Sequence, residues 1–279
     1  MNFDTAPASN YPLPDLVEFL NRGFEAYFVP IQFNAITFLD MLRKDGIDLT
    51  ASRVLILEDQ PCGIALLARR GWASRLAAMG IAMEVRGKGA GSWFMAELIQ
   101  EACQRNDREM VLEVIEQNEP AVKLYQKSGF QTVRRLIGFT RRDKEAQENE
   151  RSALHKIDLR EMGRLVSQHG LPDLPWQLSG ESIAQMNPPA RAYCKGPAYL
   201  AISNPEAEHV VIWSLLVEQD ARGDGLGPDM LRSVIASHRG KTWHVPAIFP
   251  EEFGKVFEKA AFAREELSQW QMKLNLQGR

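Results

Sequence analysis

The chain of 279 residues has little of several features that would assign it to a special class. Its three cysteines, Cys62, Cys103 and Cys194, lie too far apart in sequence for a disulfide framework or a metal cluster. The five histidines show no ligand spacing, so we expect no metal site. No apolar run has membrane-spanning length, and the N-terminus lacks the basic start and apolar core of a signal peptide. These absences predict a reduced, cytoplasmic protein without membrane contact.

The chain also has no excess of charge of one sign. Its formal net charge is −3, so no basic field indicates nucleic acid. Apolar residues make up 45% and charged residues 25%, an ordinary composition for a globular protein. The length allows one large domain or two of ordinary size, and the composition leaves the oligomeric state open.

What the sequence does have is a glycine-rich turn, Arg86-Gly87-Lys88-Gly89-Ala90-Gly91. The apolar run Leu76–Val85 predicts a strand before it, and the spacing of Phe94, Met95 and Leu98 predicts a helix after it. Glycine permits a positive φ and lets a ligand approach the backbone. Free N–H groups at the helix start, together with the charges of Arg86 and Lys88, would attract an anion. The pattern predicts a diphosphate cradle.

Other kinds of glycine-rich turn fit less well. A Walker loop needs Ser or Thr after Gly-Lys, but Gly89 follows Lys88. A dinucleotide fingerprint would need glycine where Ser92 stands. An ordinary surface turn remains an alternative. The order Arg-x-x-Gly-x-Gly resembles the coenzyme A loop of the GCN5-related N-acetyltransferases, the GNAT superfamily.

A second stretch strengthens this resemblance. The apolar run Glu109–Ile115 predicts another strand, and it is followed by Asn118-Glu119-Pro120-Ala121-Val122-Lys123-Leu124-Tyr125-Gln126-Lys127-Ser128-Gly129-Phe130. Asn, Ala, Leu-Tyr and Gly-Phe stand at the spacing of a second GNAT motif. Both motifs together identify the first half as similar to a GNAT domain.

The remainder of the first half predicts a mixed α/β layer around one central sheet. Helices are expected at Leu16–Tyr27 and Thr37–Arg43, strands at Arg53–Leu57 and Gly63–Ala68, and a closing pair of strands near Gln131–Arg141. In the GNAT fold, two early helices form a wall on the acceptor side. Here that region is rich in aromatic residues, of which we expect most to be core: Phe19, Phe24, Tyr27, Phe28, Phe33 and Phe38.

The second half repeats the first. Arg222-Gly223-Asp224-Gly225-Leu226-Gly227 follows the first glycine turn by 136 residues and also follows an apolar run, Val210–Val217. The stretch Val256–Phe262 matches Leu124–Phe130 at an offset of 132 residues. Matches in the same order at nearly one offset indicate an internal duplication.

The charged connector Arg141–Arg151 marks the expected boundary. We therefore predict two tandem GNAT-like α/β domains, residues 1–142 and 143–279, each a mixed central sheet flanked by helices.

The resemblance implies an N-acetyltransferase that uses acetyl-coenzyme A as co-substrate. Tyr125 stands at the family position of the acid that protonates the departing thiolate. Leu112-Glu113-Val114 resembles the strand that carries the base in ribosomal-protein alanine acetyltransferases, so Glu113 is the predicted base. A structural ion pair between Glu113 and a nearby arginine is the alternative, and Glu84 and Glu116 are alternative bases. The predicted coenzyme A contacts are Met79, Gly80, Ile81, Arg86, Gly87, Lys88, Gly89, Ala90, Gly91, Ser92 and Asn118.

The second copy departs from the pattern. Phe257 stands for Tyr125, Val245 for Glu113, Pro250 for Asn118, Ala261 for Gly129 and Asp224 for Lys88. These changes predict a copy without catalysis. The acceptor is expected to be an amine on a small molecule or a peptide, and transfer of a larger acyl group stays open. A non-catalytic acyl-coenzyme A-binding or regulatory protein is the rival interpretation.

The cradle can be tested by substitution. Gly89→Asp or Gly91→Asp is expected to abolish coenzyme A binding, because a Cβ and a negative charge would occupy the diphosphate position. Calorimetric titration measures this directly, and unchanged affinity in both variants would contradict the assignment.

Overall fold

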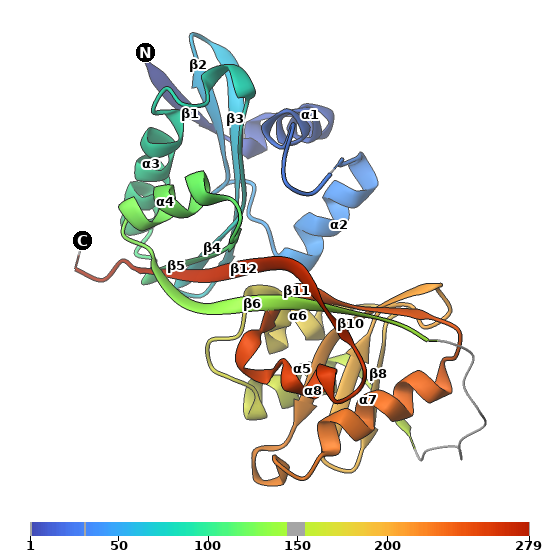
Figure 1. Cartoon of the computed structure of the whole chain (residues 1–279). Coiled ribbons are helices and arrows are strands. Elements are labelled where there is room, and N and C mark those ends of the chain that lie inside the picture. Colours follow the sequence, from blue (N-terminus) through green and yellow to red (C-terminus); the bar gives the residue numbers. More distant parts are fainter. Residues whose placement is uncertain (1, 31, 144–153, 279) are drawn as a thin grey trace. The chain divides into compact units, whose positions relative to one another are not determined.

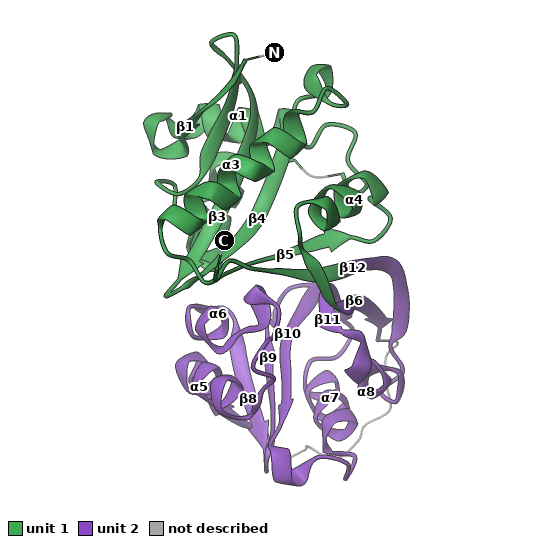
Figure 2. Ribbon diagram, turned by 90° about the vertical axis from the view of Figure 1, so that its left-hand side faces the viewer, with its two compact units in different colours: residues 1–133, 270–279 green, residues 134–269 purple. Residues whose placement is uncertain are grey.

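The computed structural model describes residues 2–30, 32–143 and 154–278. The chain forms two compact units (Figure 2). Unit 1 comprises Met1–Val133 and Trp270–Arg279, and unit 2 comprises Arg134–Gln269. Most of the predicted charged connector, from residue 144 on, lies outside the described residues.

Unit 1 alternates strands and helices around a mixed sheet. Its strands lie in the order β1-β2-β3-β4-β5-β12. The β4–β5 pair is parallel, whereas β1–β2, β2–β3 and β3–β4 are antiparallel. The elements are β1 (Phe3–Pro7), α1 (Leu13–Gly23), α2 (Ala35–Asp45), β2 (Arg53–Leu57), β3 (Gln60–Arg70), β4 (Ala73–Ile81), α3 (Ala90–Gln104), β5 (Glu109–Ile115), α4 (Glu119–Lys127) and the end of β12 (Ala263–Asn275).

Helices cover both faces of this sheet (Figure 1). On one face, Phe94 and Leu98 of α3 and Tyr125 of α4 share a buried cluster with β5. On the other face, Leu16 and Leu20 of α1 and Phe38 of α2 form a separate cluster with β2 and β3. The apolar stripe of each helix therefore explains its place in the layer.

Unit 2 repeats this architecture. Its sheet has the order β6-β11-β10-β9-β8-β7, with β10 and β11 parallel. Helices α5 and α6 cover one face, and α7 and α8 cover the other. The elements are β6 (Gln131–Arg142), β7 (His155–Ile157), α5 (Leu159–His169), α6 (Gly180–Ala184), β8 (Arg191–Lys195), β9 (Ala198–Ile202), β10 (His209–Val217), α7 (Leu226–Ser237), β11 (Thr242–Pro250) and α8 (Lys255–Glu258).

The two halves of the chain exchange their last strands. β6 follows α4 in sequence, but from Arg134 on it belongs to unit 2, where it pairs antiparallel with β11. β12 follows α8, yet its residues from Trp270 on belong to unit 1. There Met272, Leu274 and Leu276 enter the core cluster of α3 and α4. The boundary between the units is thus not the single division at residue 142 that was predicted, because each sheet is completed by a strand from the other half of the sequence.

The predicted α/β class and the tandem arrangement are confirmed. Two details of the prediction are wrong. The strand expected at Leu76–Val85 ends at Ile81, and Met83–Val85 is a single 3-10 turn with Val85 buried. The closing pair near Gln131–Arg141 is one long strand, β6. Among the described helices, none is long and apolar enough to cross a membrane.

The exchanged strand leads to a prediction about stability. Deleting residues 270–279 is expected to cost about 5–9 kcal/mol in unit 1, because three buried apolar side chains are lost at about 1.5–3 kcal/mol each. That is comparable with the whole stability of a typical domain, so hydrogen exchange in β5 and α3 is expected to rise to the unfolded rate. Deleting only residues 277–279 keeps all three side chains and serves as the control. A native exchange pattern in the longer deletion would contradict the prediction.

Candidate active site in unit 1

The glycine turn between β4 and α3 has the conformation that its sequence predicts. Gly87 has φ of 75° and Gly89 has φ of 84°, and Gly89 is the N-cap of α3. A Cβ built on either glycine would meet no atom within 4 Å, so the backbone faces open space. Lys88 and Ser92 are exposed beside it, whereas Ala90 is buried. The first N–H groups of α3 have no acceptor inside the helix and are available to an anion.

The third glycine of the turn has a different role, and the expectation that its Cβ would occupy the diphosphate position is wrong. A Cβ on Gly91 would lie 3.3 Å from Cδ2 of Leu124 and 3.5 Å from Cδ1 of Ile81. Gly91 therefore lets α3 approach both α4 and the end of β4. This packing brings the turn, Ile81 and α4 together.

Arg86 fixes the turn to the protein backbone. Its Nε donates to the carbonyl of Ile81 at 2.7 Å, and its Nη2 donates to the carbonyls of Gly23 at 2.9 Å and Glu25 at 3.2 Å. The guanidinium thus ties the end of β4 to the end of α1. A direct contact between Arg86 and a diphosphate stays a prediction.

Strand β4 separates from its parallel neighbour beside the turn. The ladder between β4 and β5 runs from Ala73↔Glu109 to Leu76↔Leu112. From residue 77 on, β4 keeps its antiparallel partner β3, and no pairing with β5 is found among the described residues. Met79, Gly80 and Ile81 lie in this separated part. One edge of their backbone therefore has no strand partner among the described residues, and contact of these residues with a ligand stays a prediction.

Gly80 also allows α1 to pack directly on the separated strand. A Cβ on Gly80 would lie 2.8 Å from the Cα of Gly23, the last residue of α1. A Cβ on Gly23 would lie 2.7 Å from the Cα of Gly80. The two backbones touch, so neither position accepts a side chain without movement of α1.

Tyr125 lies on α4 with 8% of its surface exposed. Its ring makes an edge-to-face contact with Phe130, with ring centroids 5.9 Å apart. Burial raises the pKa of Tyr125 above its ordinary value, and the nearby Tyr27 raises it further. The hydroxyl therefore carries its proton at neutral pH, as an acid must.

Asn118 is the N-cap of α4. Its Oδ1 accepts a hydrogen bond from the backbone N–H of Ala121 at 3.3 Å. Its side chain also hydrogen-bonds Tyr27, which lowers the pKa of that phenol, although burial outweighs this and the net shift is upward. Tyr27, Asn118 and Tyr125 thus form one group, in which Tyr27 was expected only as part of an aromatic wall. Nothing in its sequence position could have shown this role.

Glu113 forms a buried ion pair on β5. Nε of Arg75 donates to its Oε2 at 2.7 Å, and Arg75 also pairs with Asp45 at 3.1 Å. The side chains of Arg75 and Glu113 are only 5% and 3% exposed. Burial lowers the pKa of Arg75, but the two carboxylates outweigh it and raise that pKa above its ordinary value. This contact is the ion pair that was the alternative to a base.

The second carboxylate oxygen of Glu113, Oε1, takes no part in this ion pair. Within the part of the chain that the structure describes, Oε1 is buried and has no hydrogen-bond partner. Buried carboxylate oxygens without a partner are uncommon in proteins. Oε1 is therefore the atom that could accept a proton or a hydrogen bond from a bound amine or water.

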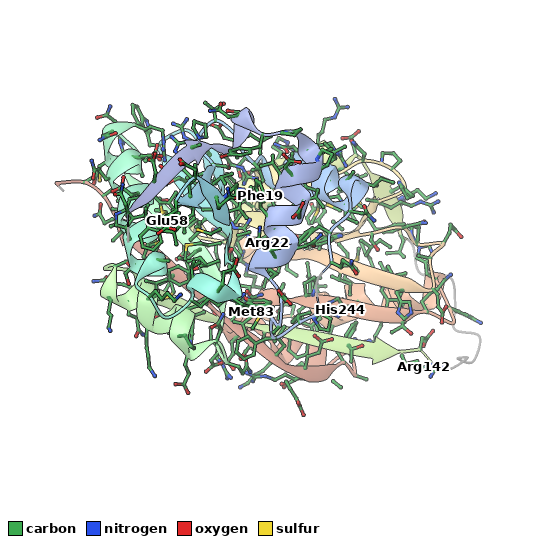
Figure 3. The ribbon with its side chains drawn as sticks, turned by 90° about the horizontal axis from the view of Figure 1, so that it is seen from above. Phe19, Arg22, Glu58, Met83, Arg142 and His244 are labelled. Atoms are coloured by element: carbon green, nitrogen blue, oxygen red, sulfur yellow. The ribbon has the colours of Figure 1, made fainter. Side chains whose placement is uncertain are left out.

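The two alternative bases lie in different surroundings. Glu84 is exposed and forms an ion pair with Arg22 of α1 at 2.8 Å (Figure 3 labels Arg22 and the neighbouring Met83). The backbone N–H of Glu84 itself and the pair with Arg22 hold its pKa below the ordinary value, which does not favour a base at neutral pH. Glu116 follows β5 directly and is half-buried.

The second copy reproduces the backbone of the site. Gly223 and Gly225 have φ of 103° and 77°, and Nε of Arg222 donates to the carbonyl of Val217 at 3.1 Å. Nη2 of Arg222 reaches the carbonyl of His169 at the end of α5, as Arg86 reaches the end of α1. Phe257 packs edge-to-face on Phe262, with ring centroids 5.6 Å apart.

One correspondence between the copies needs correction. In the β4–β5 ladder of unit 1, Arg75 lies opposite Val111. In the β10–β11 ladder of unit 2, Val211 lies opposite His244. Because β4 and β10 correspond at an offset of 136 residues, these ladders align Leu112 with Val245 and Glu113 with Pro246. The counterpart of Glu113 is therefore Pro246 and not Val245. Neither of these two residues of unit 2 carries a carboxylate.

Comparison with known proteins agrees with this geometry. Residues 14–130 match the model of the acetyltransferase (GNAT) family. The fold is similar to that of a GCN5-related N-acetyltransferase from Sphaerobacter thermophilus, with a TM-score of 0.69 at 13% identity over 98% of this chain and 96% of that chain. A tandem GNAT protein from the clavulanic acid biosynthesis pathway is similar over 100% of both chains, with a TM-score of 0.63 at 13% identity. Comparison with curated protein sequences gave no significant match.

Residues 14–130 therefore belong to the GNAT acetyltransferase family, and the whole chain has a tandem GNAT fold.

The buried ion pair supplies a stability test. Arg75→Met is expected to cost about 3–5 kcal/mol, because it leaves the Glu113 carboxylate buried without its cation. Adding Glu113→Gln is expected to recover a large part of this cost, since no uncompensated charge remains. Urea unfolding measures both. Lys123→Met is the control, because Lys123 and Glu119 are 67% and 73% exposed and such a pair is worth about 0–1 kcal/mol. Equal costs for Arg75→Met and Lys123→Met would contradict the prediction.

Proposed function

We propose that unit 1 transfers an acetyl group from acetyl-coenzyme A to an amine on a small molecule or a peptide. The observation that carries this proposal is the open glycine turn at the start of α3, directly beside the separated part of β4. An anion cradle next to a free strand edge suits a long ligand with a diphosphate and an amide-bearing arm. Membership of residues 14–130 in the GNAT family supports the same reaction class.

Binding divides between the turn and the strand. The backbone N–H groups of Gly87 to Ser92 and the ammonium of Lys88 hold the diphosphate. Met79, Gly80 and Ile81 offer backbone groups to the amides of the pantetheine arm. Arg86 acts mainly by holding β4, α1 and the turn in register. Asn118 starts α4 and orients Tyr27 on the same side as Tyr125.

Two side chains would carry out the proton transfers, one as a base and one as an acid. Acetyl-coenzyme A supplies an activated thioester carbonyl, which an uncharged amine can attack. Oε1 of Glu113, directly or through a water molecule, takes the proton that the amine must lose. The hydroxyl of Tyr125 gives its proton to the departing thiolate. Positioned acids and bases of this kind contribute about 10²–10⁴-fold in rate.

Unit 2 is proposed to be catalytically silent. Phe257 has no proton to give, and Pro246 and Pro250 replace Glu113 and Asn118 at the corresponding places. The rival function is that of an acyl-coenzyme A-binding or regulatory protein without catalysis. Titration with acetyl-coenzyme A, alongside measurement of coenzyme A release with a panel of amines, separates the two. Binding without release for every amine would favour the rival.

The asymmetry of the two units can be tested with a matched pair of variants. Tyr125→Phe removes one hydroxyl, so the packing on Phe130 survives while turnover is expected to fall by about 10²–10⁴-fold. Phe257→Tyr adds the hydroxyl in unit 2, but it is not expected to create activity in a Tyr125→Phe background. Turnover is measured with the best amine of the panel. Full turnover in Tyr125→Phe, or restored turnover in the double variant, would contradict the assignment.

A further inference from the structure

The buried pair of Arg75 and Glu113 has a third member, Asp45. Nη1 of Arg75 donates to Oδ2 of Asp45 at 3.1 Å, while its Nε donates to Oε2 of Glu113 at 2.7 Å. The Asp45 side chain is 18% exposed, so the whole group is largely shielded from water. One guanidinium therefore connects the end of α2 with β4 and β5, all within unit 1.

The position of Asp45 is one that its own helix does not favour. Asp45 is the last residue of α2, which is capped by Gly46 with φ of 69°. The C-terminus of a helix carries a partial negative charge, so it favours cations such as the neighbouring Arg43 and Lys44 and disfavours a carboxylate. The stability of α2 thus gives no reason for an aspartate here, whereas the contact with Arg75 does.

The contact with Asp45 affects how Arg75 binds Glu113. A guanidinium frequently binds one carboxylate with two parallel N–H groups, which occupy both of its oxygens. Here only one oxygen of Glu113 is bound, because Oε1 is buried and has no hydrogen-bond partner among the described residues. A planar guanidinium that reaches Asp45 with Nη1 is fixed in its orientation. In this orientation Nε meets Oε2, and no second N–H reaches Oε1.

An unoccupied oxygen is what a carboxylate base requires. In the proposed reaction, an N–H bond of the attacking amine breaks and its proton passes to Oε1, directly or through a water molecule, as the nitrogen bonds to the thioester carbonyl carbon. If a cationic N–H already occupied Oε1, a charge-assisted hydrogen bond would have to break first.

We infer that Asp45 is a positioning residue, which keeps Oε1 of Glu113 free by holding Arg75 in the orientation in which it donates to Oε2 alone. The inference rests on the proposed function, in which Glu113 is the base. Unit 2 has Val211 and Pro246 at the places of Arg75 and Glu113, so it contains neither the guanidinium nor the carboxylate.

Variants of Asp45 in the full-length protein test this role. Asp45→Ala removes the acceptor of Nη1, so Arg75 is expected to turn and bind both oxygens of Glu113. With the best amine of the panel, kcat is then expected to fall about tenfold to a hundredfold, which is part of the contribution of a positioned base. KM for acetyl-coenzyme A is expected to stay unchanged, because the glycine turn and the end of β4 are not altered.

Two matched variants serve as controls. Asp45→Asn keeps an oxygen for Nη1 of Arg75, so it is expected to retain most of the turnover. Asp40→Ala also removes a carboxylate from α2, but Asp40 is 53% exposed and pairs with Arg43 and Lys44. Turnover of this variant is expected to equal that of the wild type.

A second background tests whether the two N–H groups of Arg75 are the cause. Lysine carries the same charge but is a point contact and cannot bind both oxygens in parallel. In Arg75→Lys, the additional change Asp45→Ala is therefore expected to have little effect on kcat. A crystal structure of Asp45→Ala gives a readout without turnover, in which Nη2 of Arg75 is expected within about 3.2 Å of Oε1. This structure also decides the question if Arg75→Lys does not fold.

Any of four results would overturn the inference. They are an unchanged kcat in Asp45→Ala, equal losses in Asp45→Ala and Asp45→Asn, a large further loss from Asp45→Ala in the Arg75→Lys background, and an Oε1 that stays unbound in the Asp45→Ala structure. Wild-type protein that transfers no acetyl group to any amine would instead refute the proposed function. The Asp45→Ala structure would still show whether Asp45 keeps Arg75 away from Oε1.

Discussion

The candidate site of unit 1 depends on a parallel strand pair that stops early, and unit 2 repeats this feature. In unit 1 the ladder between β4 and β5 ends after four residue pairs, and in unit 2 the ladder between β10 and β11 ends after three. A strand that leaves its neighbour exposes N–H and C=O groups, which are costly if buried without partners. The separated part of β4 is nevertheless held by β3 on its other edge and by the contact between Gly80 and Gly23. This edge of β4 is therefore held in place by the protein itself before any ligand arrives.

The two copies keep this frame and differ in the groups that handle protons. Arg86 and Arg222 each bind the carbonyl of the last residue of the separated strand and a carbonyl at the end of the first α-helix of the unit, α1 or α5. Their role is to join backbone segments, which explains why the same residue type serves in both units. Around this common frame, unit 1 buries Arg75 with Glu113, whereas unit 2 places Val211 and a proline there. The two units thus share the same backbone arrangement, but unit 2 lacks the buried charged pair.

Much of this could be predicted from local sequence signals. The conformation of the glycine turn follows from Gly87 and Gly89, because only glycine adopts such φ angles without strain, and the helices follow from their apolar stripes. The partner of Glu113 could not be predicted, because Arg75 lies 38 positions earlier and only the β4–β5 register brings the two together. Tyr27 was missed for the same reason. The alignment of Glu113 with Val245 was wrong because a sequence offset cannot reveal which residues face each other across a ladder.

The exchange of β6 and β12 also fixes an order of events during synthesis. Domains usually fold from the N-terminus as the chain leaves the ribosome. Unit 1 cannot do so fully, because Met272, Leu274 and Leu276 complete its core and are translated after all of unit 2. Until then the outer edge of β5 lacks its final neighbour, and an open edge of this kind invites pairing with other chains. Unit 1 is thus made first and finished last, so a nascent chain interrupted before residue 270 would leave this edge of β5 without its neighbour.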